Sequence, residues 1–247
     1  MAATTDHGEE AAPKDPSRSP APRRGKIATA VSVFGELLIT AGVILGLFVA
    51  YSLWWTNVVA DRAAGKQGDK IRDQWKGNGG PGALDTKDGI GFLHVPAMSG
   101  GEVLVEKGTD AKILNDGVAG YYTDPVKAAL PTNGKDGNFS LAAHRDGHGA
   151  KFHNIDKIEK GDPIVFETKD DWYVYKVYDI LPETSKYNVD VLDKVPEESG
   201  KKKPGKYITL TTCTPVYTST YRYVVWGELE RVDKVDADRT PPKELRE

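Results

Sequence analysis

A long uncharged apolar segment near the start of the chain constrains the architecture more than any other feature. The segment "LLITAGVILGLFVAYSLWW" runs from Leu37 to Trp55 without a charged side chain. As a helix it is roughly 28 Å long, close to the ~30 Å hydrocarbon core of a bilayer. Its apolar residues surround the helix on all sides, and Tyr51, Trp54 and Trp55 suit the membrane interface. The segment therefore predicts a single transmembrane anchor over residues 37–55.

Two alternatives to an anchor are a cleaved signal peptide and a buried helix. The apolar core of a signal peptide is usually only about 7–15 residues long, and so long an uncharged run is rare in soluble folds. Residues 1–26 are rich in Ala, Pro, Ser and charge, with the basic residues late, and a disordered tail is predicted over residues 1–36. Basic residues before the span favour a cytoplasmic N-terminus, so the C-terminal part is expected outside the cell.

The rest of the chain divides into three regions by composition. Residues 56–88 carry many charges and glycines and predict an extracellular linker. Residues 89–233 hold short apolar runs separated by turn signals, which is typical of one β domain. Residues 234–247 are predicted to be a polar C-terminal tail. The formal net charge of −3 gives no reason to expect nucleic acid as a partner.

Many short strands and few helices predict an all-β fold, a closed or nearly closed barrel that is mostly antiparallel. The "ETKDDW" segment reads as a hairpin turn, and "DAKILNDGV" and "YNVDVLDKV" as short helices. The predicted strands are "IGFLHV", "EVLVEKG", "FSLAAH", "PIVFET", "WYVYKVYDI", "YITLTTC" and "YRYVVWGELE".

Cys213 is the only cysteine, so the chain forms no internal disulfide, and no Cys/His spacing indicates a zinc site. Side chains alternate between the faces of a strand. This places Cys213 opposite Ile208 and Leu210, and His144 opposite Phe139 and Leu141. Most lone cysteines are small buried hydrophobes. The alternation favours a functional thiol here instead.

A thiol needs partners before it acts as a nucleophile, because only about 3% is thiolate at neutral pH in an ordinary environment. Arg222 follows Cys213 after a short loop, and the two can face each other across an antiparallel pair. Its permanent charge would favour thiolate and stabilise an oxyanion. A solvated strand arginine is the alternative. Among the clustered histidines, His144 ends a strand and is favoured over His148 and His153 as acid and base.

These segments resemble the sortase family. "TLTTC" followed by "YRYVVWG" is similar to the TLxTC…R signature of sortases, and "NFSLAAHR" resembles the segment that carries their histidine. "GFLHVPAM" and "VLVEKG" resemble their opening strands. The "TCTP" and "GVAGYY" stretches, with the N-terminal anchor, are most similar to class E sortases of high-GC Gram-positive bacteria. Ala143 departs from the family, since many relatives have Gly before the histidine.

The resemblance implies an eight-stranded sortase-type β-barrel with short helices and a cysteine transpeptidase. It implies that Cys213 attacks the Thr–Gly bond of an LAxTG-type sorting motif on a surface protein. His144 would act as acid and base, and Arg222 would hold the substrate backbone and the oxyanion. An amino group of a peptidoglycan precursor would then accept the cargo. A tyrosine near "GVAGY" is linked to the choice of Ala in the motif, which indicates Tyr121, with Tyr122 as the adjacent alternative.

Some sortases bind calcium through clustered acidic residues, but the acidic pairs 170–171 and 197–198 lie in turn-like segments, so we expect no metal and no other cofactor.

Two other functions share these features. One is a surface cysteine peptidase that releases cargo by hydrolysis. The other is a membrane-tethered β-barrel that binds a partner and whose cysteine is incidental. An ordinary His/Cys pair is mostly neutral at pH 7. If catalysis needs both residues charged, only a small fraction of the enzyme is competent, and activity is expected to be bell-shaped in pH.

Overall fold

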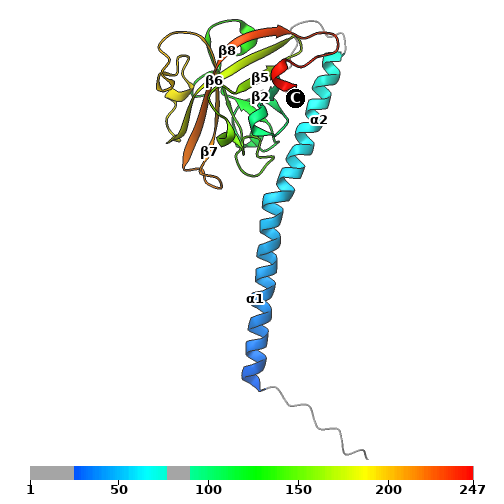
Figure 1. Cartoon of the computed structure of the whole chain (residues 1–247). Coiled ribbons are helices and arrows are strands. Elements are labelled where there is room, and N and C mark those ends of the chain that lie inside the picture. Colours follow the sequence, from blue (N-terminus) through cyan, green and yellow to red (C-terminus); the bar gives the residue numbers. More distant parts are fainter. Residues whose placement is uncertain (1–24, 77–89, 247) are drawn as a thin grey trace, which may run out of the picture. The chain divides into compact units, whose positions relative to one another are not determined.

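The computed structural model describes residues 25–76 and 90–246 (Figure 1). The chain divides into two units, Met1–Leu47 and Phe48–Glu247. Most of helix α1 (Lys26–Ala50) lies in the first unit, and none of its residues is buried by protein. The helical stretch Lys26–Lys76 is long and apolar enough to cross a membrane, by length and composition.

Helix α1 begins well before the predicted anchor. Residues 26–36 were expected to belong to the disordered tail, but they are helical. The sequence there, "KIATAVSVFGE", contains no proline and continues the apolar character of the segment that follows. The rest of the predicted tail, residues 1–24, lies outside the described residues.

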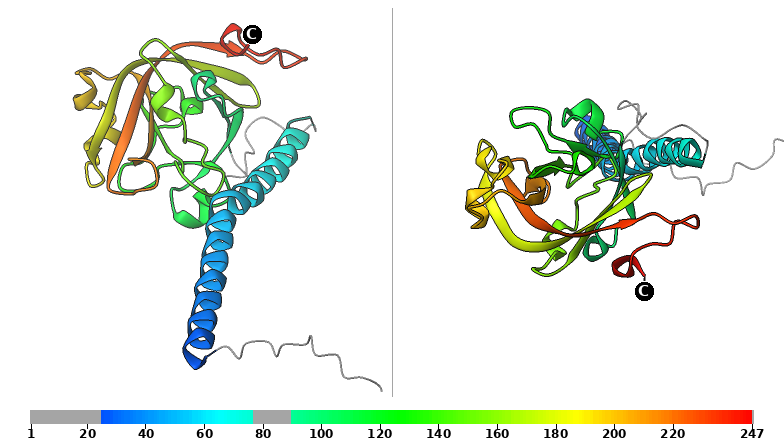
Figure 2. Two further views of the ribbon diagram at one scale, coloured as in Figure 1. Left: turned by 60° about the horizontal axis from the view of Figure 1, so that its bottom comes forward. Right: turned by 90° about the horizontal axis from the view of Figure 1, so that it is seen from above.

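Eight strands close into a barrel in the order β1-β2-β3-β4-β7-β8-β6-β5, which confirms the predicted fold class. Strands β2 and β3 pair in parallel, as do β4 and β7, and all other neighbours are antiparallel. Figure 2 shows the long ribbon that β6 and β8 form across the barrel. The strands are β1 Gly91–His94, β2 Glu102–Lys107, β3 Ala119–Tyr121, β4 Gly137–Ala142, β5 Pro163–Glu167, β6 Asp171–Ser185, β7 Lys206–Thr214 and β8 Tyr221–Lys234.

All seven predicted strands are present, and the predicted hairpin pairs Glu167 with Trp172. Strand β3 was not among the predicted strands. Three residues are too few to show an alternating pattern, and this strand is "AGY". It joins β2 to β4 and so closes the gap between them.

The interior of the barrel follows the predicted alternation. Phe139 and Leu141 from β4 and Ile208 and Leu210 from β7 lie in the main hydrophobic core. The opposite face of these strands is also covered, because Thr209 is fully buried. Alternation therefore assigns the two faces correctly, although both are buried along the middle of the strands.

Apart from α1 and α2, the helical elements outside the barrel are short. The two segments predicted as short helices become α3 and a 3₁₀ turn, η5. These elements are α2 Thr56–Lys76, α3 Ala111–Leu114, the π-helical turn η1 Tyr51–Trp55, and the 3₁₀ turns η2 Pro96–Met98, η3 Pro131–Asn133, η4 Ile155–Lys157, η5 Asp190–Leu192, η6 Glu197–Ser199 and η7 Lys243–Leu245.

Helix α2 differs from the linker predicted for residues 56–88. Ile71 is 1% exposed and packs with Phe92 of β1, and a Cβ at Gly68 would lie 3.1 Å from the Phe92 ring. The charged residues that indicated a linker are exposed on this helix, except Arg72, which is partly buried against the barrel. The rest of the predicted linker, residues 77–89, lies outside the described residues.

The predicted polar tail also differs, because residues 235–246 pack on the barrel. Val235 and Leu245 contact the small core around Trp172. Arg239 donates to Glu167 at 2.7 Å. Glu167 also accepts from Arg72 of α2 and lies 2.9 Å from His94, so one buried carboxylate joins α2, β1 and the C-terminal segment.

Candidate active site

The ends of β4 and β7 bring His144 and Cys213 to the same rim of the barrel. The two strands are parallel neighbours, and Ala142 is opposite Thr211 at the end of their ladder. Continuing that register by two residues places His144 beside Cys213. The Thr212 hydroxyl donates to the Ala143 carbonyl at 2.7 Å and holds the two ends together. Cys213 is partly exposed, so its thiol lies outside the core.

Arg222 lies directly opposite Cys213 in the β7–β8 ladder. This is the pairing that the sequence predicted. Its Nη1 donates to the carbonyls of Tyr221 at 2.9 Å and Ser219 at 3.2 Å. Among the described residues, its Nε and Nη2 groups have no protein acceptor, so they can donate to a ligand in the cavity that Arg222 lines.

The three predicted catalytic residues line one cavity of about 410 Å³. A cavity of this size accommodates several residues of an extended peptide rather than a whole domain. Its remaining walls come from the α3 region, the segment after β3 and the loop around η5. With residues at the ends of β4 and β7, the other lining residues are Thr109, Ala111, Leu114, Tyr122, Asp124, Pro125, Ala142, Ala143, Lys186, Asn188, Val189, Val191, Leu192, Thr211 and Thr212.

Tyr121 was predicted to contact substrate, and the structure places it elsewhere. Its side chain is 6% exposed and belongs to the barrel core. Successive strand residues point to opposite faces, so the next residue, Tyr122, lines the cavity instead. The Tyr122 hydroxyl lies 2.9 Å from the Thr211 hydroxyl. Burial raises the pKa of Tyr122 against the opposing effect of that hydrogen bond, so the phenol stays protonated.

His144 lies in a partly buried environment that favours its neutral form. Burial lowers its pKa, the nearby His148 lowers it further, and Asp146 offsets only part of this. The Nε2 of His144 is 2.9 Å from the Asn115 side-chain oxygen, which can only accept. Nε2 therefore carries the proton of the neutral ring, which leaves Nδ1 as the acceptor for a substrate proton.

The other two clustered histidines do not share the hydrogen bond of His144. The His148 ring centroid is 5.6 Å from that of His144. His153 Nδ1 contacts the Arg145 carbonyl at 2.9 Å. Asp146 accepts from the Tyr217 amide at 2.6 Å, so its carboxylate is engaged by the β7–β8 loop.

Arg145 links the segments that carry His144 and Cys213 and was not selected from the sequence. It is 5% exposed, donates to the Thr214 hydroxyl at 2.9 Å and pairs with Asp156 at 3.0 Å. Arg145, the residue after His144, is thus hydrogen-bonded to Thr214, the residue after Cys213. Asn115 was also missed. It follows a separate four-residue helix, and nothing in the sequence connects that segment with His144.

One group of described residues, His94, Glu102 and Glu167, has ligand atoms close enough for a metal ion. Arg72 and Arg239 already contact Glu167, and Arg72 also contacts Glu102. Two guanidinium groups in this position oppose a cation, so the residues form an ion-pair cluster and do not fit a metal. The cluster lies on α2, β1, β2 and β5, none of which carries the predicted catalytic residues.

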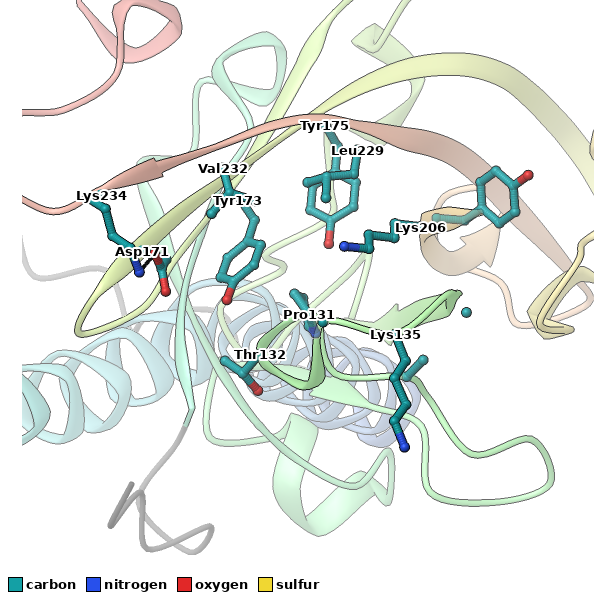
Figure 3. Close-up of a pocket in the computed structure, with 14 residues that line it drawn as sticks. Pro131, Thr132, Lys135, Asp171, Tyr173, Tyr175, Lys206, Leu229, Val232 and Lys234 are labelled. Carbon is teal, nitrogen blue, oxygen red and sulfur yellow. Dashed lines mark ion pairs between the residues drawn. The ribbon is translucent and has the colours of Figure 1, made fainter. Parts of the chain in front are cut away.

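A second cavity, of about 300 Å³, lies near the other end of β7. Figure 3 shows Tyr173 and Tyr175 projecting toward the segment that carries Pro131, with Lys206 beside them. Lys206 begins β7, whereas Cys213 lies near its end. This cavity has no cysteine or histidine among its lining residues. The cavity that contains Cys213 is therefore the better candidate for an active site.

Comparisons with known proteins agree with this choice. Residues 93–230 match the sortase domain model. The chain is 74% identical to sortase SrtE2 of Streptomyces coelicolor, over the whole of both chains. It is 46% identical to sortase SrtE1 of the same organism, over 89% of this chain and 65% of the relative. The crystal structure of sortase E1 from Streptomyces coelicolor, with a tripeptide in the active site, is 47% identical. It superposes with a TM-score of 0.60 over 64% of this chain and 96% of its own.

Proposed function

The chain belongs to the sortase family of cysteine transpeptidases, and we propose that Cys213, His144 and Arg222 are its catalytic residues. The observation that carries this proposal is that three strand ends bring a thiol, an imidazole and a guanidinium to one cavity. Thioacyl transfer needs a nucleophile, an acid and base, and a donor for the oxyanion. These side chains supply the three functions.

As a sortase, the enzyme acts on surface proteins, and the bond that we propose it cleaves is Thr–Gly in an LAxTG-type motif. The Cys213 thiol gives its proton to His144 Nδ1, the thiolate attacks the Thr carbonyl carbon, and Arg222 donates to the resulting oxyanion. When the C–N bond breaks, His144 gives its proton to the departing glycine amine. The incoming amine then loses a proton to His144 as it attacks the thioester, and the Cys213 thiolate leaves. We propose an amino group of a peptidoglycan precursor as this acceptor.

Tyr122, rather than Tyr121, is the tyrosine that we propose contacts the motif. It lines the cavity within reach of Thr211, whereas Tyr121 lies in the core. Two residues of this wall, Tyr122 and Leu192, present apolar surface that suits a small side chain in the motif. Replacing Tyr122 by Ala removes most of this surface and should therefore lower the ratio of the LAxTG rate to the LPxTG rate.

The proposal is tested by incubating the full-length protein in detergent with an LAxTG peptide and an amine, and measuring the products by mass. We expect ligated product, formed faster than from the LPxTG counterpart. Cys213→Ala should abolish it. A hydrolysed product, with no ligation at high amine concentration, would instead identify a surface peptidase.

Arg222→Lys tests the oxyanion role separately. Lysine keeps the positive charge but loses the planar fork of donors. We expect kcat/KM to fall by roughly 100-fold. Alkylation of Cys213 by a small thiol reagent should persist, because the thiol and its cavity remain. An Arg222→Lys enzyme with the wild-type kcat/KM would exclude this role.

A further inference from the structure

In the loop that follows His144, two residues with a Cβ adopt a left-handed backbone conformation that such residues do not favour. Four consecutive residues have positive φ: Gly147 at +64°, His148 at +47°, Gly149 at +83° and Ala150 at +40°. For the two residues with a Cβ, this left-handed conformation costs on the order of 1 kcal/mol each. Such strain persists only where neighbouring structure holds the backbone in place.

Helix α2 supplies that support. The Asn57 side-chain oxygen accepts a hydrogen bond from the Gly149 amide at 2.9 Å. One turn later, Asp61 pairs with Lys151 at 2.8 Å, and the Lys151 side chain is only 16% exposed. Two side chains of the helix therefore contact the strained loop, at the residues on either side of Ala150.

The same turns of α2 contact the segment that carries the partner of His144. A Cβ on Gly117 would lie 3.0 Å from the backbone carbonyl of Ala60, so helix and turn are in direct backbone contact. Gly117 has a φ of +76°, which favours glycine a second time. Asn115, whose side-chain oxygen lies 2.9 Å from His144 Nε2, is two residues earlier.

We propose that helix α2 is a positioning element for the catalytic histidine, and that Asn57 and Asp61 are its positioning residues. The helix holds the loop after His144 and the turn after Asn115 against each other, and so sets the direction of the imidazole. This inference rests on the acid–base role proposed for His144. Because α2 follows α1 and η1 without a break in the sequence, the apolar segment of the chain leads directly into the element that orients the reacting group.

The test uses full-length protein in detergent and the double variant Asn57→Ala/Asp61→Ala. Misplacing the imidazole should lower kcat for LAxTG ligation by about 10-fold, with KM within a factor of two. The amides of residues 145–151 should exchange with solvent roughly fivefold faster, because a hydrogen bond and an ion pair are lost. Asp69→Ala, at an exposed position of the same helix, is the matched control and should change neither quantity.

Single substitutions at Asn57 separate positioning from stability. Asn57→Asp keeps an oxygen that accepts from Gly149 and should retain most of kcat, whereas Asn57→Leu should not. The inference is overturned if the double variant keeps the wild-type kcat or loop exchange rate, or if Asn57→Asp loses as much kcat as Asn57→Leu. The exchange measurement needs no substrate. A wild-type enzyme that fails to ligate the peptide would therefore contradict the proposed function while leaving the loop comparison to decide the role of α2.

Discussion

At the scale of single residues, the protonation of His144 is the property that most affects the proposed chemistry. Burial and the neighbouring His148 both lower its pKa. The described residues place no carboxylate in hydrogen bond with its ring; Asn115 takes that position. A neutral amide fixes the ring without stabilising its charged form. The imidazolium is therefore scarcer at pH 7 than in an exposed histidine, which limits its supply as the acid that protonates the leaving amine.

We expect a bell-shaped pH dependence of kcat/KM whose acid limb follows His144. Replacing His148 by Ala removes the group that opposes protonation of His144, so its pKa should rise. The acid limb should then move upward by roughly 0.5 pH. Rates of peptide ligation across a pH series would measure the shift.

His153→Ala is the control for this prediction, because His153 contacts the backbone of Arg145 and not the His144 ring. Its acid limb should match that of the wild type. A wild-type profile that rises continuously to high pH, or an unmoved acid limb in His148→Ala, would contradict the prediction.

At the scale of elements, Glu167 explains how segments outside the barrel attach to it. Burial alone would raise the pKa of this carboxyl, but hydrogen bonds from His94, Arg72 and Arg239 outweigh that effect and lower it to about 2. The unfolded chain releases these partners, so its carboxyl titrates near the ordinary value of about 4.3. The stabilisation is present above pH ~4.3 and is lost as the pH falls toward 2.

Glu167→Gln should therefore lower the free energy of unfolding by about 3 kcal/mol at pH 7, because two guanidinium groups lose their carboxylate. The difference from the wild type should shrink between pH 4.3 and 2. Urea unfolding over this pH range measures both effects. Glu102→Gln is the matched control: its side chain is 46% exposed, and we expect a loss below about 1 kcal/mol. Equal losses in the two variants would show that burial of Glu167 has no special effect.

At the scale of the whole molecule, the proposed reaction requires enzyme, cargo and acceptor on the same side of a membrane. We propose that the apolar helix is the anchor and that the barrel, with α2 and the C-terminal segment, is outside the cell. The uncovered apolar surface of α1 supports this, since such surface favours lipid. The basic residues before it, Arg23, Arg24 and Lys26, favour a cytoplasmic N-terminus.

The topology predicts how the full-length protein behaves in cells. It should remain with membranes after an alkaline wash, and protease added to wall-stripped cells should remove the barrel. An antibody tag placed before residue 24 should stay protected until the membrane is opened. Protein released by the wash, or a barrel protected in intact cells, would contradict the proposed localisation.

Patterns within single segments determined much of this protein from sequence alone. Alternation in "YITLTTC" placed Cys213 away from the core, and the loop length after it placed Arg222 on the opposing strand; the structure confirms both. These features depend on the backbone of one strand or hairpin, which neighbouring residues set. The assignment of Tyr121 failed at the same scale, because β3 is too short to show which of two adjacent tyrosines points inward.

Only the tertiary structure decided which distant segments meet. Asn115 lies beside His144, Asn57 beside Gly149, and Arg239 beside Glu167, although each pair is far apart in the sequence. The charged residues of α2 and of residues 235–246 indicated solvent-exposed chain, and both segments pack on the barrel. Their composition reports an average over all side chains, whereas packing depends on the few apolar groups and ion-pair partners on one side. Those groups come into contact only in the folded barrel.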